Sequence, residues 1–271
     1  MERERFIRID DAADPRIAAY RDIREKDLVG RNGHFIAEGE VVLRALANAP
    51  HHRAVSILIV EKRLERLGPL LAAFPAGTAI YVASQPVLDA IAGFPMHRGV
   101  LALGARGPAR AARALLADLP QRACVAVLFA IANHDNMGGI FRNAAAFGLN
   151  AILLDSRCCD PFYRKAIRVS VGASLAVPSA RFGADEEILD TLAGYGFRSY
   201  ALAPRGGAML DALAPSARAA LLFGPEGPGL PDDVLAGAVR ATIAMAPGFD
   251  SLNVATASGI AMHHFTRGQW N

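Results

Sequence analysis

Three short segments of the chain place glycine or asparagine beside charged or hydroxyl side chains. Residues 136–144 carry Asn136 and Arg142, residues 223–230 carry Glu226, and residues 243–254 carry Ser251 and Asn253. Each segment adjoins an apolar run, and none of these polar side chains has an evident structural role. In α/β proteins, ligands bind at the carboxyl ends of the strands. The amides, the carboxylate and the guanidinium therefore indicate a binding or catalytic site.

The first segment separates Asn136 and Arg142 by six residues. Six residues of α-helix turn through about 240°, so the two side chains need not share a face. Asn136 or Asp135 is the expected N-cap of this helix. Arg142 lies in an apolar helix that we expect to be buried, where a charge needs a partner. An arginine that reaches the surface or forms an internal ion pair is the alternative to a functional one.

The second segment has three glycines and two prolines between residues 224 and 229. This composition predicts a tight turn whose exposed backbone lets a ligand approach closely. The alternative is an ordinary loop from a strand to a helix, with Glu226 in solvent. The glycine order of a dinucleotide-binding loop is absent.

The third segment predicts a turn at Pro247 and Gly248 that leads into a final helix over 251–269. Ser251 is the expected N-cap of that helix. Asparagine has poor helix propensity, so Asn253 in the first turn indicates a function. Ile243 and Leu252 could equally belong to the core.

Secondary-structure patterns divide the chain at a loop-rich break between residues 104 and 121. Before the break, helices and strands alternate, which predicts a small three-layer α/β domain. The expected elements there are helices 40–47, 64–74 and 86–92, and strands 55–60, 79–82 and 100–103. After the break, apolar runs predict a parallel sheet with helices on both faces. The expected elements there are strands 123–131, 151–154, 175–178, 197–202 and 219–223, and helices 136–147, 161–169, 185–193 and 251–269.

Bulk composition limits the class of protein. The 271 residues suit two domains. No apolar run reaches the ~18–20 residues that span a bilayer, and the charged N-terminus is unlike a signal peptide. The three cysteines, Cys124, Cys158 and Cys159, fit neither a disulfide framework nor a zinc site. We therefore expect a cytoplasmic protein with reduced thiols, no membrane segment and no metal.

The net charge of +3 lies in the N-terminal part of the chain. Residues 1–110 hold 16 basic and 13 acidic side chains, whereas residues 111–271 hold 13 of each. Arginine outnumbers lysine 26 to 3, which favours contacts with phosphate, although genome base composition explains the bias equally well. An anionic partner is a weak expectation from these counts.

The three segments, in this order, resemble the motifs of the SpoU (TrmH-type) RNA ribose 2′-O-methyltransferases of the SPOUT superfamily. The resemblance implies a SPOUT α/β domain with a parallel sheet and a deep trefoil knot over 121–271, after a linker at 107–120. Residues 35–40 and 96–102 are similar to the substrate-binding domain often fused to these enzymes, which implies a ribosomal-protein-like, RNA-binding α/β domain over 1–106.

The resemblance implies methyl transfer from S-adenosyl-L-methionine to a ribose 2′-hydroxyl of rRNA or tRNA by a homodimer. By analogy, the catalytic residues are Asn136, Arg142, Glu226, Ser251 and Asn253, and the cofactor-binding residues are Ala203, Gly224, Ile243 and Leu252. The family's usual proline and serine are replaced here by Ala244 and Ala255. A chain that keeps the fold but serves as a catalytically silent RNA-binding or ribosome-assembly factor is the alternative.

Several further basic side chains are candidates for RNA contact. They are Arg164, Lys165, Arg168, His97 and Arg98. A solvated helix face explains the first three equally well, and a structural loop role explains the other two. A chain that begins near Ala111 is expected to stay folded and to bind cofactor, yet to lose most of its affinity for RNA.

Overall fold

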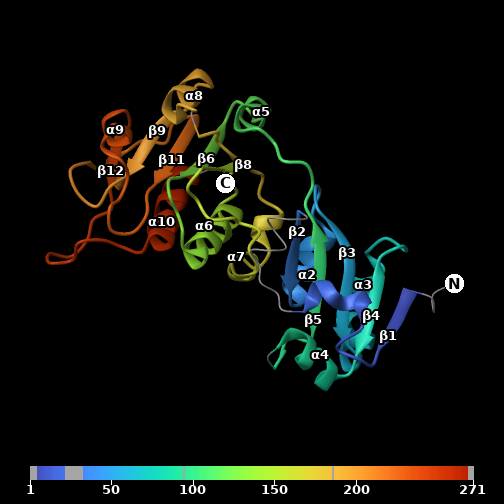
Figure 1. The fold of residues 1–271 in the computed structure, drawn as a ribbon. Coiled ribbons are helices and arrows are strands. Elements are labelled where there is room, and N and C mark those ends of the chain that lie inside the picture. The colour runs from blue at the N-terminus through green and yellow to red at the C-terminus, as the bar shows by residue number, and fades with distance from the viewer. Residues whose placement is uncertain (1–4, 22–32, 94, 185, 268–271) are drawn as a thin grey trace. The chain divides into compact units, whose positions relative to one another are not determined.

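The computed structural model describes residues 5–21, 33–93, 95–184 and 186–267. The chain divides into two compact units (Figure 1). Unit 1 comprises Met1–Pro108 together with Phe162–Ala176, and unit 2 comprises Ala109–Pro161 together with Val177–Asn271. Both units contain a sheet covered by helices, so the expected α/β class is confirmed. The trefoil knot stays a prediction.

Unit 1 is built on a five-stranded mixed sheet in the order β1-β4-β3-β5-β2. β1, β4 and β3 run parallel, and β5 pairs antiparallel with both β3 and β2. The strands are β1 (Phe6–Ile9), β2 (His34–Glu38), β3 (Arg53–Val60), β4 (Ala79–Ala83) and β5 (Val100–Ala105). The helices are η2 (Pro15–Tyr20), α2 (Glu40–Ala47), η3 (Glu61–Arg63), α3 (Leu64–Ala72), α4 (Gln85–Ala92), α7 (Arg164–Val169) and η4 (Ala173–Leu175).

Side chains that alternate along β3 form two separate cores in unit 1. Ile57 and Ile59 pack with buried residues of α2 and α3. Leu58 and Val60, on the opposite face, pack with buried residues of η2 and α4. Because side chains alternate across a strand, one apolar run serves both faces. The expected three-layer arrangement is therefore present.

The segment 162–176 belongs to unit 1, although the sequence placed it in the C-terminal domain. Ile167 of α7 and Leu175 of η4 are buried in the core that contains α2 and α3. Arg164 Nη1 donates a hydrogen bond of 3.1 Å to Glu38 Oε2 at the end of β2. Apolar packing and an ion pair thus hold this segment, and the chain passes between the units three times.

His52 contacts the chain near two of the points where it leaves or re-enters unit 1, at Gly107 and at Phe162. Its Nδ1 accepts a hydrogen bond of 3.2 Å from the backbone N–H of Gly107. Its ring lies 4.8 Å from that of Phe162, centroid to centroid, in an edge-to-face arrangement. Burial, with the nearby charges of His51 and Arg106, lowers the pKa of His52 to about 4. The ring is therefore neutral at pH 7, which leaves Nδ1 free to accept this bond.

Unit 2 is built on a seven-stranded, fully parallel sheet in the order β10-β12-β9-β11-β6-β7-β8. The strands are β6 (Ala123–Leu128), β7 (Ala151–Leu154), β8 (Ser179–Arg181), β9 (Arg198–Leu202), β10 (Ala208–Met209), β11 (Arg218–Phe223) and β12 (Val239–Thr242). The helices are α5 (Ala112–Ala117), α6 (His134–Ala146), α8 (Ile188–Gly194), η5 (Leu210–Ala212), α9 (Asp232–Ala236) and α10 (Val254–Thr266). The strand expected at 175–178 is wrong, because η4 ends at Leu175 and β8 begins at Ser179.

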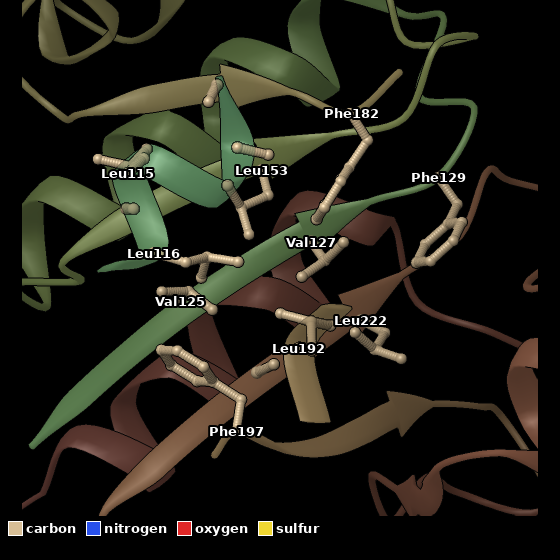
Figure 2. Packing of buried hydrophobic residues seen from close by; sticks show 14 of the residues in the cluster. Leu115, Leu116, Val125, Val127, Phe129, Leu153, Phe182, Leu192, Phe197 and Leu222 are labelled. Atoms are coloured by element: carbon tan, nitrogen blue, oxygen red, sulfur yellow. The ribbon is translucent and has the colours of Figure 1, made fainter. Parts of the chain in front are cut away.

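One face of this sheet packs against α5, α8 and α9. Figure 2 shows side chains of α5 and α8 beside those of β6 and β11. Val125 and Val127 of β6 and Leu222 of β11 meet Leu116 of α5 and Leu192 of α8 there. Buried side chains of α6 and α10 lie outside this cluster, and these two helices contact each other. Helices therefore cover both faces, as the sequence predicted.

Cys124, Cys158 and Cys159 are free thiols. Burial raises the pKa of Cys124 and that of Cys158 to about 12, so both stay protonated at neutral pH. Among the described residues, no helix is both long and apolar enough to cross a membrane.

The position of segment 162–176 changes the expectation for a chain that begins at Ala111. Without residues 1–108, Ile167 and Leu175 lose the core that covers them, and burial of each is worth about 1.5–3 kcal/mol. We expect this shortened chain to aggregate and to bind a hydrophobic dye strongly. Replacing both residues with serine in the shortened chain should lower dye binding. Equal dye fluorescence from the shortened and full-length chains would contradict this account.

Candidate functional site

The site is built where three neighbouring strands of unit 2 end. Ala203 directly follows β9, Gly224 follows β11 and Ile243 follows β12. β9 pairs with both β11 and β12, so the parallel register brings these three residues to one edge of the sheet. The backbone N–H of Ala203 donates a bond of 3.0 Å to Ala241 O, which fixes the first of these loops.

These strand ends line a cavity of about 280 Å³. All four predicted cofactor-binding residues lie in its wall, together with Glu226 and Ser251. The four are Ala203, Gly224, Ile243 and Leu252. Most of the remaining wall is apolar and includes Phe223, Leu230 and Met245. The cavity therefore suits a ligand that has a large apolar part and a few polar groups.

The turn after β11 presents Glu226 at the cavity. A Cβ atom added to Gly224 would lie 2.5 Å from Gly229 C and from Leu230 N, so only glycine fits there. Gly229, at φ +73°, closes the turn by donating from its N–H to Pro225 O at 3.2 Å. The glycines expected to form a tight turn thus fold this loop back on itself.

Three of the predicted catalytic side chains are joined by hydrogen bonds. Glu226 Oε1 accepts from Asn136 Nδ2 at 3.0 Å and from Asn253 Nδ2 at 2.7 Å. Asn253 Nδ2 also donates to Asn136 Oδ1 at 2.8 Å. The two amides therefore fix one oxygen of the carboxylate, while Oε2 accepts no hydrogen bond from the described residues. Ser251 lines the same cavity and is exposed.

Both helix caps differ from those expected. Asn133, rather than Asn136 or Asp135, is the N-cap of α6. Asn253, rather than Ser251, is the N-cap of α10, and its Oδ1 accepts from Ala255 N at 2.9 Å and Thr256 N at 3.3 Å. An amide side chain has both an acceptor and a donor. Asn253 can therefore cap its helix and bind Glu226 at the same time.

Close packing of α6 against α10 holds the two asparagines in place. Asn143 Nδ2 donates to Ala255 O at 2.7 Å and to Ser258 Oγ at 3.0 Å. A Cβ atom added to Gly139 would lie 2.7 Å from Ala255 Cβ, so the helices meet closely here. Sequence reasoning overlooked Asn143, although it lies within the first motif.

Arg142 does not lie in a buried helix face, so that expectation is wrong. Its side chain is exposed on α6, whereas Asn136 is only 7% exposed. The helical rotation between them explains the difference, because it turns Arg142 away from the face that buries Asn136. Within the described residues, Arg142 forms no hydrogen bond or ion pair, and its guanidinium is open to solvent.

The five residues predicted to contact RNA all belong to unit 1, including the three on α7. His97, Arg98 and Lys165 are exposed and Arg168 is partly buried. Arg164 is bound to Glu38, and Arg98 Nε lies 3.7 Å from Glu38 Oε1. Glu38 is 5% exposed and so carries a buried charge between two arginines. Arg164 therefore has a structural partner.

Comparison with known proteins identifies relatives of the whole chain. The model of the SpoU rRNA Methylase family matches residues 123–263. An uncharacterised tRNA/rRNA methyltransferase of Mycobacterium tuberculosis is 39% identical over 266 residues, covering 95% of this chain and 90% of the relative. No group of three or more metal-binding side chains is found among the described residues.

Solved structures share the fold. An AdoMet-bound rRNA methyltransferase from Sinorhizobium meliloti superposes with a TM-score of 0.79 at 24% identity, covering 97% of this chain and 98% of that one. A SpoU methyltransferase from Streptomyces viridochromogenes, also in complex with AdoMet, gives 0.77 at 19% identity, covering 95% and 99%. At these identities the likeness establishes the fold alone.

Asn253 has two structural roles that substitutions can separate. Asn253→Ala removes the cap of α10 and the bonds to Asn136 and Glu226, and we expect it to lower the free energy of unfolding by about 1–2 kcal/mol. Asn253→Ser keeps a capping oxygen and should recover about 1 kcal/mol of this loss. Urea unfolding measures both variants. An unchanged midpoint for Asn253→Ala would contradict the capping role.

Proposed function

The chain belongs to the SpoU rRNA methylase family, and we propose that it transfers a methyl group from S-adenosylmethionine to a ribose 2′-hydroxyl of structured rRNA or tRNA. The observation that carries this proposal is the position of Glu226. It lies in the wall of the cavity and is held there by Asn136 and Asn253. A carboxylate fixed beside a ligand cavity can orient a hydroxyl group.

S-adenosylmethionine fits the groups that line this cavity. The apolar wall suits an adenine ring, and Gly224 places the start of the Glu226 turn in the same wall. We assign Ala203, Gly224, Ile243 and Leu252 to its binding. When bound, the cofactor supplies a methyl group already activated by the sulfonium charge, so the protein contributes mainly by positioning.

The residues around Glu226 then have distinct roles in our proposal. Glu226 Oε2 accepts a hydrogen bond from the 2′-hydroxyl, while the two amides hold Oε1. Ser251, also in the cavity wall, contacts the substrate ribose. The exposed guanidinium of Arg142 binds the phosphate next to that ribose and polarises the hydroxyl, because it stays charged and donates in a planar fork.

Unit 1 contributes to RNA binding in this proposal. His97, Arg98, Lys165 and Arg168 contact phosphate, whereas Arg164 orients α7 through Glu38. We further propose that the protein acts in the cytoplasm as a homodimer. The alternative function, a silent RNA-binding or ribosome-assembly factor, requires the same fold and differs only in the absence of methyl transfer.

Gly224→Ala tests the cofactor site. The added Cβ must displace the backbone of Gly229 and Leu230, so we expect the affinity for S-adenosylhomocysteine to fall by at least about tenfold. Gly194→Ala is the matched control, since a Cβ at Gly194 meets nothing within 4 Å. Calorimetry on both variants and the unmodified chain measures affinity and stoichiometry, with one site per chain expected. Folded, unmodified protein that binds neither this ligand nor S-adenosylmethionine would disprove the cofactor assignment.

Arg142→Ala tests the reaction. RNA from cells without the gene is compared with RNA from cells that express the unmodified chain, Arg142→Ala or the control Arg122→Ala. A ribose 2′-O-methyl group blocks alkaline cleavage, so we expect one new alkali-resistant linkage with the unmodified chain and the control. Loss of a stabilising donor costs about 10²–10³ in rate, so Arg142→Ala should transfer methyl groups at no more than ~1% of the normal rate in vitro.

The outcomes of this experiment separate the candidate functions. A new base methylation without a resistant linkage would disprove the ribose target. Absence of any methylation by the unmodified chain would favour the silent RNA-binding factor. A rate for Arg142→Ala within about threefold of normal, less than ~1 kcal/mol, would disprove the role of Arg142 alone.

A further inference from the structure

Phe249 is the most exposed large hydrophobic residue in the described part of unit 2. Its side chain is 72% exposed, compared with 49% for Met209 and 40% for Ile260. It lies in the turn between β12 and α10, two residues before Ser251. Single exposed apolar residues are common on protein surfaces, so the position of this ring, rather than its exposure, is informative.

Two interactions flank Phe249 in the turn that carries it. The N–H of Phe249 donates to Ala246 O at 3.3 Å, across Gly248 at φ +87°. The next residue, Asp250, forms an ion pair with Arg205 in the loop after β9. Met245 and Asp250 line the cavity, whereas Phe249 does not. The exposed ring therefore belongs to a turn whose neighbouring residues Met245 and Asp250 line the cavity.

The separation along the chain keeps Phe249 close to Ser251, which we propose contacts the substrate ribose. Two residues span at most about 7 Å, so the Cα atoms of Phe249 and Ser251 are no farther apart than that. A ribose bound at Ser251 and Glu226 carries a base that must occupy space beside the cavity. Since Asp250 and Arg205 neutralise each other, the turn offers an uncharged aromatic face. Such a face suits a nucleobase better than a phosphate.

We propose that Phe249 stacks on the unpaired base of the nucleotide that is methylated. This inference rests on the proposed function and adds a substrate class to it, namely RNA whose target nucleotide is unpaired. Proteins that read single-stranded RNA stack exposed bases on aromatic side chains. Stacking tolerates any base because every base has a π face, so Phe249 selects for an unpaired base and not for its identity.

A fluorescent base analogue tests stacking directly. The probe is a single-stranded oligoribonucleotide with one 2-aminopurine, titrated into the full-length chain, whose binding should quench the fluorescence. Stacking is worth about a 5- to 100-fold change in affinity per base. We expect Phe249→Ala and Phe249→Leu to weaken binding by that amount, and Phe249→Trp to retain it. Met209→Ala, a change at another exposed apolar residue of unit 2, should leave binding unchanged.

Methyl-transfer kinetics and oligomeric state complete the test. With RNA that the unmodified chain methylates, Phe249→Ala should raise KM for RNA about 5- to 100-fold and leave the affinity for S-adenosylhomocysteine unchanged. Unchanged probe binding and KM for this variant would overturn the inference, as would equal quenching by a fully paired probe. A shift of Phe249→Ala from dimer to monomer would also overturn it, because the ring would then belong to a subunit interface. Failure of the unmodified chain to methylate any RNA would instead overturn the proposed function, and the probe titration is independent of that result.

Discussion

The candidate site depends on one carboxylate oxygen that accepts two amide hydrogen bonds. Glu226 Oε1 joins Asn136 at the start of α6 to Asn253 at the start of α10, and these residues lie 90 and 27 positions away in the sequence. Each partner is fixed by another constraint. Asn253 caps α10, Asn136 follows the cap residue Asn133, and the turn from Gly224 to Gly229 leaves room for no side chain at its first position. Three segments must therefore fold correctly before this oxygen has both donors.

Much of this arrangement could be predicted from the sequence, because its signals are local. Apolar runs such as 123–131 indicate strands buried on both faces, and a parallel sheet brings the residues after neighbouring strands to one edge. The family resemblance named Ala203, Gly224 and Ile243 as cofactor-binding residues, and all three line one cavity. The strand β10 was overlooked, since two residues at the sheet edge give little periodic signal.

The remaining features depend on contacts that local patterns do not encode. The expected N-caps lay two or three residues from the observed ones at both α6 and α10, because several polar residues near each helix start can act as the cap. Arg142 was expected in a buried face because its neighbours are apolar, yet one helical step separates buried Phe141 from exposed Arg142. The membership of 162–176 in unit 1 rests on contacts with residues more than 100 positions away, such as Arg164 with Glu38. Local sequence patterns do not indicate a contact between residues so far apart in the chain.

The return of segment 162–176 to unit 1 has a consequence for synthesis on the ribosome. Domains generally fold as units in the order in which they emerge, with the N-terminal one first. Here the first 108 residues leave the exit tunnel without Ile167 and Leu175, which complete their core. Unit 1 can reach its final packing only after residue 176 has emerged, when β6, α6 and β7 of unit 2 have already been made. Unit 1 is therefore completed only after synthesis of unit 2 has begun, and the nascent N-terminal unit carries an uncovered apolar surface until then.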